Sequence, residues 1–190
     1  MNIVFYGGSF NPFHNGHLAL AQSIIDQQLG DKVLISVTPQ NPLKQTTELA
    51  SDEMRQAMVR LALEESRDIE LTDIEQNLPK PCYTIHTLKA LQQQYPEDRI
   101  TLLIGGDNAQ ILHKWYAYEE ILDNFTVLVY PRPEADTSTI IKHKNIKFIN
   151  APLYDISSTE IRERIKNNRS CEGLISQKVE LFIMNNKLYL

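Results

Sequence analysis

Six short apolar runs, rich in β-branched residues, alternate with longer amphipathic stretches along most of the chain. The runs have the length and composition of strands and lie at 3–6, 33–37, 69–71, 100–104, 126–130 and 146–149. Helical periodicity occupies stretches between them, at 18–29, 52–65, 84–94 and 116–122. This alternation predicts an α/β fold with an open, mainly parallel sheet, right-handed crossovers and helices on both faces.

The end of the chain follows a different pattern, because 157–190 is helical in character. Ser157 and Glu160 have the spacing of a capping box, and 176–186 predict a final helix. A chain of 190 residues can bury one sizeable core. We therefore expect a single domain over 1–190, with the helical portion 157–190 packed back on the sheet.

Composition excludes several classes of protein. Hydrophobic residues make up 42% and charged residues 23%, and no apolar run approaches the roughly 20 residues of a membrane span. A net charge of −5 offers no basic face to the phosphates of a polymeric nucleic acid. Cys82 and Cys171 form no CxxC pair, and the start of the chain lacks the pattern of a secretory signal. We expect a cytoplasmic protein with neither membrane nor nucleic-acid partners.

The first strand run leads into the segment GGSFNPFHNGH at 7–17, after which a helical pattern begins. A strand, a glycine turn and a helix start gather backbone N–H groups around an anion, so a phosphate site is predicted here. The segment is neither G-x-G-x-x-G nor a lysine-bearing P-loop, which argues against a dinucleotide dehydrogenase and a P-loop kinase.

Two histidines, His14 and His17, lie three residues apart in this segment. On one side of the turn they can present N–H donors to the same group of oxygens. A lone histidine is more often a capping or surface residue. The occurrence of both histidines in one segment with Gly8 and Gly16, at the end of a strand, favours phosphate binding for both.

A second anion site is suggested where Ser157, Ser158 and Thr159 open a predicted helix, with Arg162 one turn further on. Hydroxyls and free N–H groups at a helix start, with a guanidinium behind them, suit a phosphate. Simple N-capping with a solvated arginine explains this segment equally well when it is taken alone.

Further candidates follow strand runs, where open α/β sheets bind ligands. Asp107 comes after Gly105 and could accept hydrogen bonds from a ribose or cap the next helix. Trp115 is the single tryptophan, which without context suggests packing. Arg132 could orient a phosphate or belong to a rigid turn, and the sequence does not separate the two. The remaining histidines have no partners at metal-ligand spacing, so no metal site is predicted.

The segment at 7–17 resembles the signature of the nucleotidyltransferase superfamily, whose second half is written H-x-G-H. Further segments at 81–84, 104–107, 115–116, 132–133 and 156–162 narrow the resemblance to the bacterial nicotinate-nucleotide adenylyltransferases. The resemblance spans nearly the whole chain. It implies a Rossmann-like fold and the joining of nicotinate mononucleotide to the AMP part of ATP, which yields deamido-NAD and pyrophosphate in NAD biosynthesis.

The resemblance also implies residue roles. Catalysis falls to His14, His17 and Arg162. Contacts to ATP come from Gly8, Ser9, Phe10, His14, His17, Gly105, Asp107, Ile156, Ser158, Thr159 and Arg162. Contacts to the mononucleotide come from Asn41, Lys44, Thr84, Trp115, Tyr116 and Arg132, with the indole of Trp115 stacked on the pyridine ring. Leu43 departs from the family, which usually has a histidine after this proline. Mg²⁺ is expected to bind mainly through ATP phosphates.

The expected nucleophile, a 5′-phosphate oxygen, is already anionic, so no general base is required. Alternative acceptors are nicotinamide mononucleotide and phosphopantetheine, although enzymes acting on the latter lack the Trp115–Tyr116 segment. A noncatalytic nucleotide-binding regulator is a further alternative. A class I aminoacyl-tRNA synthetase is disfavoured by the short, acidic chain. The sequence leaves a homo-oligomeric state open.

Overall fold

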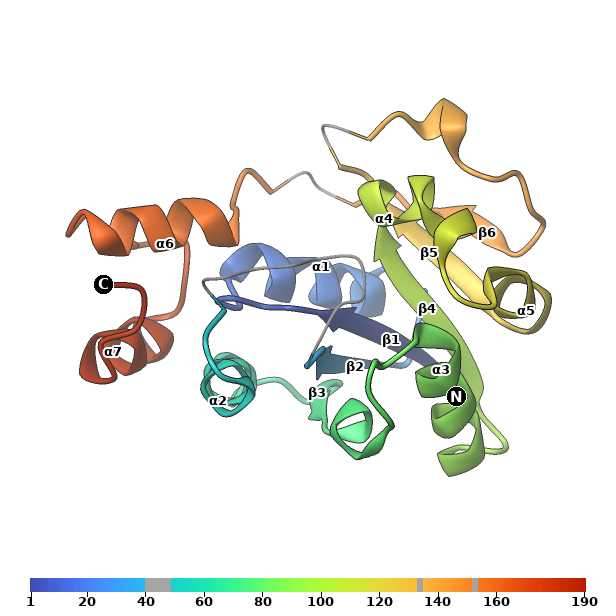
Figure 1. Ribbon diagram of the computed structural model, residues 1–190, viewed down its shortest axis with the longest axis horizontal. Coiled ribbons are helices and arrows are strands. Elements are labelled where there is room, and N and C mark those ends of the chain that lie inside the picture. Colours follow the sequence, from blue (N-terminus) through green and yellow to red (C-terminus); the bar gives the residue numbers. More distant parts are fainter. Residues whose placement is uncertain (40–48, 133–134, 152–153) are drawn as a thin grey trace.

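The computed structural model describes residues 1–39, 49–132, 135–151 and 154–190. Its sheet contains all six predicted strands, and every pair of neighbours is parallel (Figure 1). The strands are β1 (Asn2–Gly8), β2 (Lys32–Val37), β3 (Ile69–Thr72), β4 (Arg99–Gly105), β5 (Thr126–Tyr130) and β6 (Ile146–Phe148). Their order is β3-β2-β1-β4-β5-β6, which is the Rossmann order and confirms the predicted fold class.

The main helices also agree with the predicted periodicity. They are α1 (Asn15–Asp26), α2 (Asp52–Leu63), α3 (Thr84–Gln94), α5 (Tyr118–Asn124), α6 (Ser158–Lys166) and α7 (Gln177–Asn185). Four short elements were not predicted: α4 (Gly106–Gln110), η1 (Ile74–Asn77), η2 (Leu112–Lys114) and η3 (Thr137–Thr139). Each spans five residues or fewer, which is too short for periodicity to identify. No helix within the described ranges has the length and apolar character needed to cross a membrane.

Side chains that alternate along the strands build a core on each face of the sheet. Val4 and Tyr6 of β1 face the cluster that includes the apolar side of α1 and α2. Ile3 and Phe5 face the opposite cluster, which includes the apolar side of α3 and α5. This period of two is the reason the sheet is covered on both faces.

The C-terminal helices pack somewhere other than expected. Their apolar side chains gather around Met58 of α2 rather than on the sheet itself, since α1 and α2 already cover that face. Figure 1 shows α6 and α7 together at one end of the molecule, away from α5 and β6. The predicted capping box is only half formed. Ser157 accepts from the N–H of Glu160 at 3.1 Å, but the Glu160 carboxylate pairs with Arg164 at 2.8 Å instead.

The order of the strands decides where a ligand can bind. The chain proceeds outward from β1 to β3 on one side, then returns to add β4 to β6 on the other. The connections after β1 and β4 therefore lead to opposite faces of the sheet and leave a crevice at the carboxyl ends of these strands. The glycine segment that follows β1 and the Gly105–Gly106 turn that follows β4 both lie at this edge.

Candidate active site

Two neighbouring pockets open at the carboxyl edge of the sheet. The larger, here called the main cleft, has a volume of about 160 Å³ and is lined by the ends of β1 and β4 together with residues of 82–84 and 114–116. The smaller, here called the histidine pocket, is lined by His14, His17, Arg132 and Ile156, among others. Tyr6 and Tyr130 line both pockets and form the wall between them.

The two histidines form a reciprocal cap at the start of α1. The backbone N–H of His17 donates to Nδ1 of His14 at 3.3 Å, and the N–H of His14 donates to Nδ1 of His17 at 3.2 Å. Their rings stack with centroids 3.5 Å apart. Because each Nδ1 accepts a hydrogen bond, each neutral ring carries its proton on Nε2. The capping and the donor interpretations therefore describe one arrangement.

Both imidazoles are uncharged in the free protein. Burial lowers the pKa of His14 to about 4, and the positive charge of Arg132 acts in the same direction. Loss of solvent also lowers the pKa of His17 well below its ordinary value, with further contributions from His14 and Arg132. The rings thus offer two neutral Nε2–H donors to an anion.

The backbone before the histidines is closely packed. Phe10 has a φ of +44°, and its buried ring lies edge-on to His17 with centroids 4.9 Å apart. A Cβ on Gly8 would lie 2.9 Å from the buried Phe10 ring, so any other residue at this position would require that ring to shift. Ser9 and Gly8 line the main cleft.

The start of α6 lies directly on this glycine segment. The Ser158 hydroxyl donates to the carbonyl of Pro12 at 2.9 Å, and Nη1 of Arg162 donates to the carbonyl of Asn11 at 2.9 Å. Thr159 accepts from Nη2 of Arg162 at 3.4 Å. The buried Nε of Arg162 has no hydrogen-bond partner within the described part of the chain. Two segments about 150 residues apart in sequence are thus brought together, as the anion-site prediction requires.

The turn after β4 places Asp107 at the first turn of α4, with Gly105 as the N-cap. A Cβ on Gly105 would collide with the Asp107 carboxylate and would lie 3.1 Å from the Tyr130 ring. Asp107 is exposed and does not cap the helix; its nearest cation is Nε of Arg132 at 3.9 Å. Asp107 is therefore available to a ligand from solvent.

Arg132 lies in the histidine pocket rather than in the main cleft. Its Nη2 donates to the Tyr130 hydroxyl at 3.0 Å, and its Cζ lies 5.1 Å from the centre of that ring. Tyr130 and Tyr6 were not singled out from the sequence. A signal was present, since each stands in the last three residues of its strand, at the ligand-binding edge.

The main cleft brings together Thr84, Trp115 and Tyr116. Trp115 is half-buried, and Tyr116 is 57% exposed and packs on Tyr83 with ring centroids 4.7 Å apart. Thr38, Glu75, Asn108 and Lys114 also line this cleft and were not predicted. The predicted contacts Asn41 and Lys44 lie outside the described residues.

Within the described ranges, no three or more His, Cys, Asp or Glu side chains are grouped so as to hold a metal ion. The polar side chains that line the histidine pocket are two imidazoles, a guanidinium and three tyrosine side chains, and the described lining contains no carboxylate. Such a set suits the oxygens of a phosphate and not a bare cation.

Comparison with known proteins agrees with this arrangement. Residues 5–164 match the family model described as Cytidylyltransferase-like, and the chain belongs to this family. It also belongs, more narrowly, with the nicotinate-nucleotide adenylyltransferases. A relative from Flavobacterium psychrophilum, named "Probable nicotinate-nucleotide adenylyltransferase", is 42% identical over 100% of this chain and 99% of its own length. A relative of the same name from Caldicellulosiruptor saccharolyticus is 36% identical over 100% and 99%.

A solved structure shares the fold. The Plasmodium falciparum nicotinic acid mononucleotide adenylyltransferase, complexed with NaAD, superposes with a TM-score of 0.82 at 20% identity. The superposition covers 99% of this chain and 97% of the other. At this identity the likeness supports the fold alone.

Proposed function

We propose that this protein transfers the AMP moiety of ATP to nicotinate mononucleotide, releasing pyrophosphate and forming deamido-NAD. The observation that carries the proposal is the contact between α6 and the glycine segment, made by Ser158 and Arg162 on the carbonyls of Pro12 and Asn11. This contact supports a single triphosphate site built from both segments, and family membership supplies the reaction.

ATP would bind with its phosphates between the two segments. Nε2–H of His14 and His17, the Arg162 guanidinium and the hydroxyls of Ser158 and Thr159 are the donors proposed for the phosphate oxygens. Gly8, Ser9 and the backbone of Phe10 would allow close approach of the α-phosphate. Asp107 would accept from the ribose beside Gly105, and Ile156 would contact the adenosine.

The mononucleotide would occupy the main cleft. Trp115 lines this cleft and is half-buried, which suits stacking of its exposed part on a pyridine ring. Thr84 opens α3, so its hydroxyl and the free N–H groups of that helix start can take the ring carboxylate. Arg132 lies beyond the tyrosine wall, in the histidine pocket, where it is proposed to bind the phosphate of the mononucleotide close to the ATP phosphates. Asn41 and Lys44 stay predicted contacts on the mononucleotide side.

The reaction needs positioning and charge stabilisation rather than a base. A phosphate oxygen of the mononucleotide attacks the α-phosphorus of ATP in line, the bond to the bridging oxygen breaks, and pyrophosphate leaves with that electron pair. Negative charge grows on the nonbridging and leaving oxygens. His14, His17 and Arg162 would stabilise that charge, which makes them the proposed catalytic residues.

Mg²⁺ is proposed to arrive with ATP, held by phosphate oxygens and water. When bound it would neutralise part of the phosphate charge. The donor set of the histidine pocket fits this arrangement, because it supplies partners for phosphate oxygens and leaves the metal to the nucleotide. A cytoplasmic location and a homo-oligomeric state stay predictions.

The deciding experiment is pyrophosphate release from ATP and Mg²⁺ with nicotinate mononucleotide, nicotinamide mononucleotide or phosphopantetheine as acceptor. We expect release only when an acceptor is present, with the highest kcat/KM for nicotinate mononucleotide. A clear preference for the amide would overturn the substrate assignment. ATP binding without release under saturating acceptor would support a noncatalytic regulator instead.

A further inference from the structure

Two buried charged side chains at the main cleft have no role in the predicted site: Glu75 belongs to its lining, and Arg55 contacts residues that line it. Arg55 of α2 is fully buried, and Glu75 of η1 is 4% exposed. Burying a charge is costly unless hydrogen bonds compensate for the lost water, and apolar residues of similar size would often stabilise the fold equally well. Stability alone therefore does not explain these two charges, and the groups to which they are hydrogen-bonded indicate their role.

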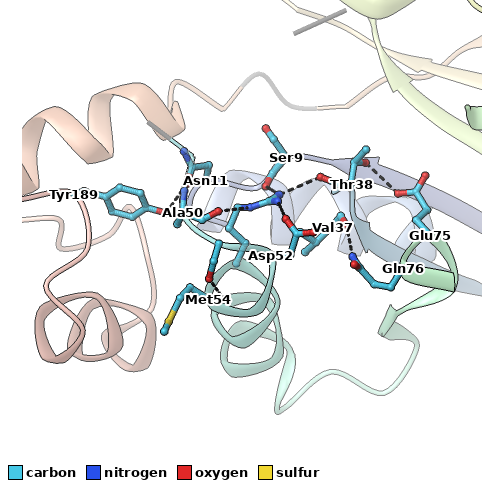
Figure 2. Close-up of polar contacts among 12 residues, drawn as sticks. Ser9, Asn11, Val37, Thr38, Ala50, Asp52, Met54, Glu75, Gln76 and Tyr189 are labelled. Atoms are coloured by element: carbon cyan, nitrogen blue, oxygen red, sulfur yellow. Dashed lines mark hydrogen bonds and ion pairs between the residues drawn. The ribbon is translucent and has the colours of Figure 1, made fainter. Parts of the chain in front are cut away.

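Arg55 connects three separate segments of backbone. Its Nη1 donates to the carbonyl of Ser9 at 2.6 Å and to that of Thr38 at 3.2 Å, and its Nε donates to the carbonyl of Ala50 at 2.9 Å. Asp52, one turn earlier in the helix, accepts from Nη2 at 2.5 Å and balances the charge. Figure 2 shows that these partners, Ser9, Thr38, Ala50 and Asp52, lie close together.

The Glu75 carboxylate accepts hydrogen bonds from the hydroxyl groups of three residues. Its Oε2 accepts from Ser36 at 2.8 Å and Thr38 at 3.1 Å, and its Oε1 accepts from Thr87 of α3 at 2.9 Å. The Cys82 thiol also donates to Oε1, at 3.7 Å. The carboxylate thus ties the end of β2 to α3, the helix that carries Thr84 at its start.

Thr38 is the residue where these two groups meet. Its carbonyl accepts from Arg55, its hydroxyl donates to Glu75, and its N–H donates to the carbonyl of Gly8 at 2.9 Å. Every backbone and side-chain polar group of Thr38 is therefore engaged, and both Thr38 and Ser9 line the main cleft. The wall of the cleft is fixed directly to the phosphate-binding turn.

We propose that Arg55 and Glu75 are positioning residues that hold Thr38 against Gly8 and Ser9. They would thereby set the distance between the main cleft, where the mononucleotide is proposed to bind, and the glycine segment, where the ATP phosphates are proposed to bind. The proposal rests on the function proposed above, since in-line attack requires both phosphates at a fixed separation. A displacement of about 1 Å costs on the order of 100-fold in rate in such a reaction. Neither residue needs to touch a substrate to act in this way.

The first test compares Arg55→Lys with Arg60→Lys. Lysine keeps the charge but cannot reach several carbonyls with a planar fork. Arg60 is an exposed arginine on the same helix, whose side chain contacts Gln56. For Arg55→Lys we expect kcat about 10-fold to 100-fold lower and a KM for the mononucleotide that rises more than the KM for ATP. Arg60→Lys should stay within about twofold of the original protein.

The second test uses Thr87, which is fully buried and does not line the main cleft. Thr87→Val keeps the shape and removes the hydroxyl that donates to Glu75, whereas Thr87→Ser keeps the hydroxyl and removes a methyl group. If positioning through Glu75 matters, the valine variant loses kcat/KM for the mononucleotide by about tenfold or more, and the serine variant retains it. If Arg55→Lys does not fold, the comparison of Thr87→Val with Thr87→Ser tests the positioning role by itself.

Thermal unfolding of each variant separates stability from catalysis. The proposal is overturned if folded Arg55→Lys keeps its kcat and mononucleotide KM, if both KM values rise equally, or if Thr87→Ser loses as much as Thr87→Val. All variants are assayed with whichever mononucleotide the original protein uses best. Failure of the substrate assignment would then show in the original protein, while failure of this inference would show only between variants.

Discussion

Because His14 is buried and neutral, the free energy of unfolding should depend on pH, and the size of this dependence can be calculated. We consider the replacement His14→Asn. Asparagine is a favoured N-cap residue, so its side-chain oxygen can still accept the N–H of His17 that now donates to Nδ1 at 3.3 Å. The replacement therefore removes a titrating group while keeping the helix cap. At pH 7 we expect the two proteins to differ in unfolding free energy by about 1 kcal/mol or less.

The magnitude follows from the two pKa values. The unfolded chain, in which this imidazole has a pKa of 6.5, binds more protons than the folded chain, in which it has a pKa of about 4. Stability is therefore full above pH 6.5 and is lost as the pH falls toward 4. Between pH 7.0 and 4.5, His14 alone should remove about 2 kcal/mol from the unfolding free energy.

Urea unfolding at the two pH values, followed by far-ultraviolet circular dichroism, measures the effect. Groups that do not interact with His14 cancel in the comparison, so the original protein should lose at least about 2 kcal/mol more than His14→Asn. His17 does not cancel, because His14 helps to lower its pKa, and that interaction adds to the difference in the same direction. Equal losses would refute the conclusion that burial holds this imidazole neutral. A larger loss in the variant would reverse the assigned direction of the pKa shift.

Three further predictions concern single residues. Arg162→Ala should lower kcat about 100-fold to 1000-fold in the pyrophosphate assay, since it removes a donor from the phosphate oxygens. Trp115→Ala should raise the KM for the mononucleotide about tenfold and leave the KM for ATP within twofold, as measured by initial rates. Gly8→Ala should destabilise the protein by about 1–3 kcal/mol in thermal unfolding, because its Cβ would lie 2.9 Å from the Phe10 ring; unchanged stability would contradict the close packing of this turn.

The central strands were predictable as apolar runs because their side chains alternate between two cores. Val4 and Ile3 point to opposite clusters, and the same period recurs in β4 and β5. The start of α1 was harder, since the helical pattern is visible only from about Leu18 while the helix begins at Asn15. Capping was one interpretation of each histidine taken alone, but the reciprocal cap that joins His14 to His17 was not predicted, because it depends on the path of the backbone between them.

Arg55 and Glu75 show what a sequence does not reveal. Arg55 lies in an amphipathic stretch where an arginine normally faces solvent, and nothing local marks it as fully buried. Its partners Ser9 and Thr38 stand 46 and 17 residues away, and they offer backbone carbonyls, which every residue type possesses. Such contacts depend on the path of the chain in three dimensions. The side chains of the candidate site were more accessible, because His14 and Asp107 follow strands and carry polar groups themselves.

An acidic protein that is to bring two polyanions together faces a conflict, since fixed positive charge would have to be buried in the free state. Here Arg132 lines the histidine pocket and Arg162 lies on the glycine segment, and each interacts with oxygens of the protein itself. His14 and His17 are neutral, because burial holds their pKa values low. A further proton would have to occupy Nδ1, which already accepts a backbone N–H, so the cap also favours the neutral ring with Nε2–H as the free donor. The two rings can therefore offer donors to phosphate oxygens without adding a buried cation to the site.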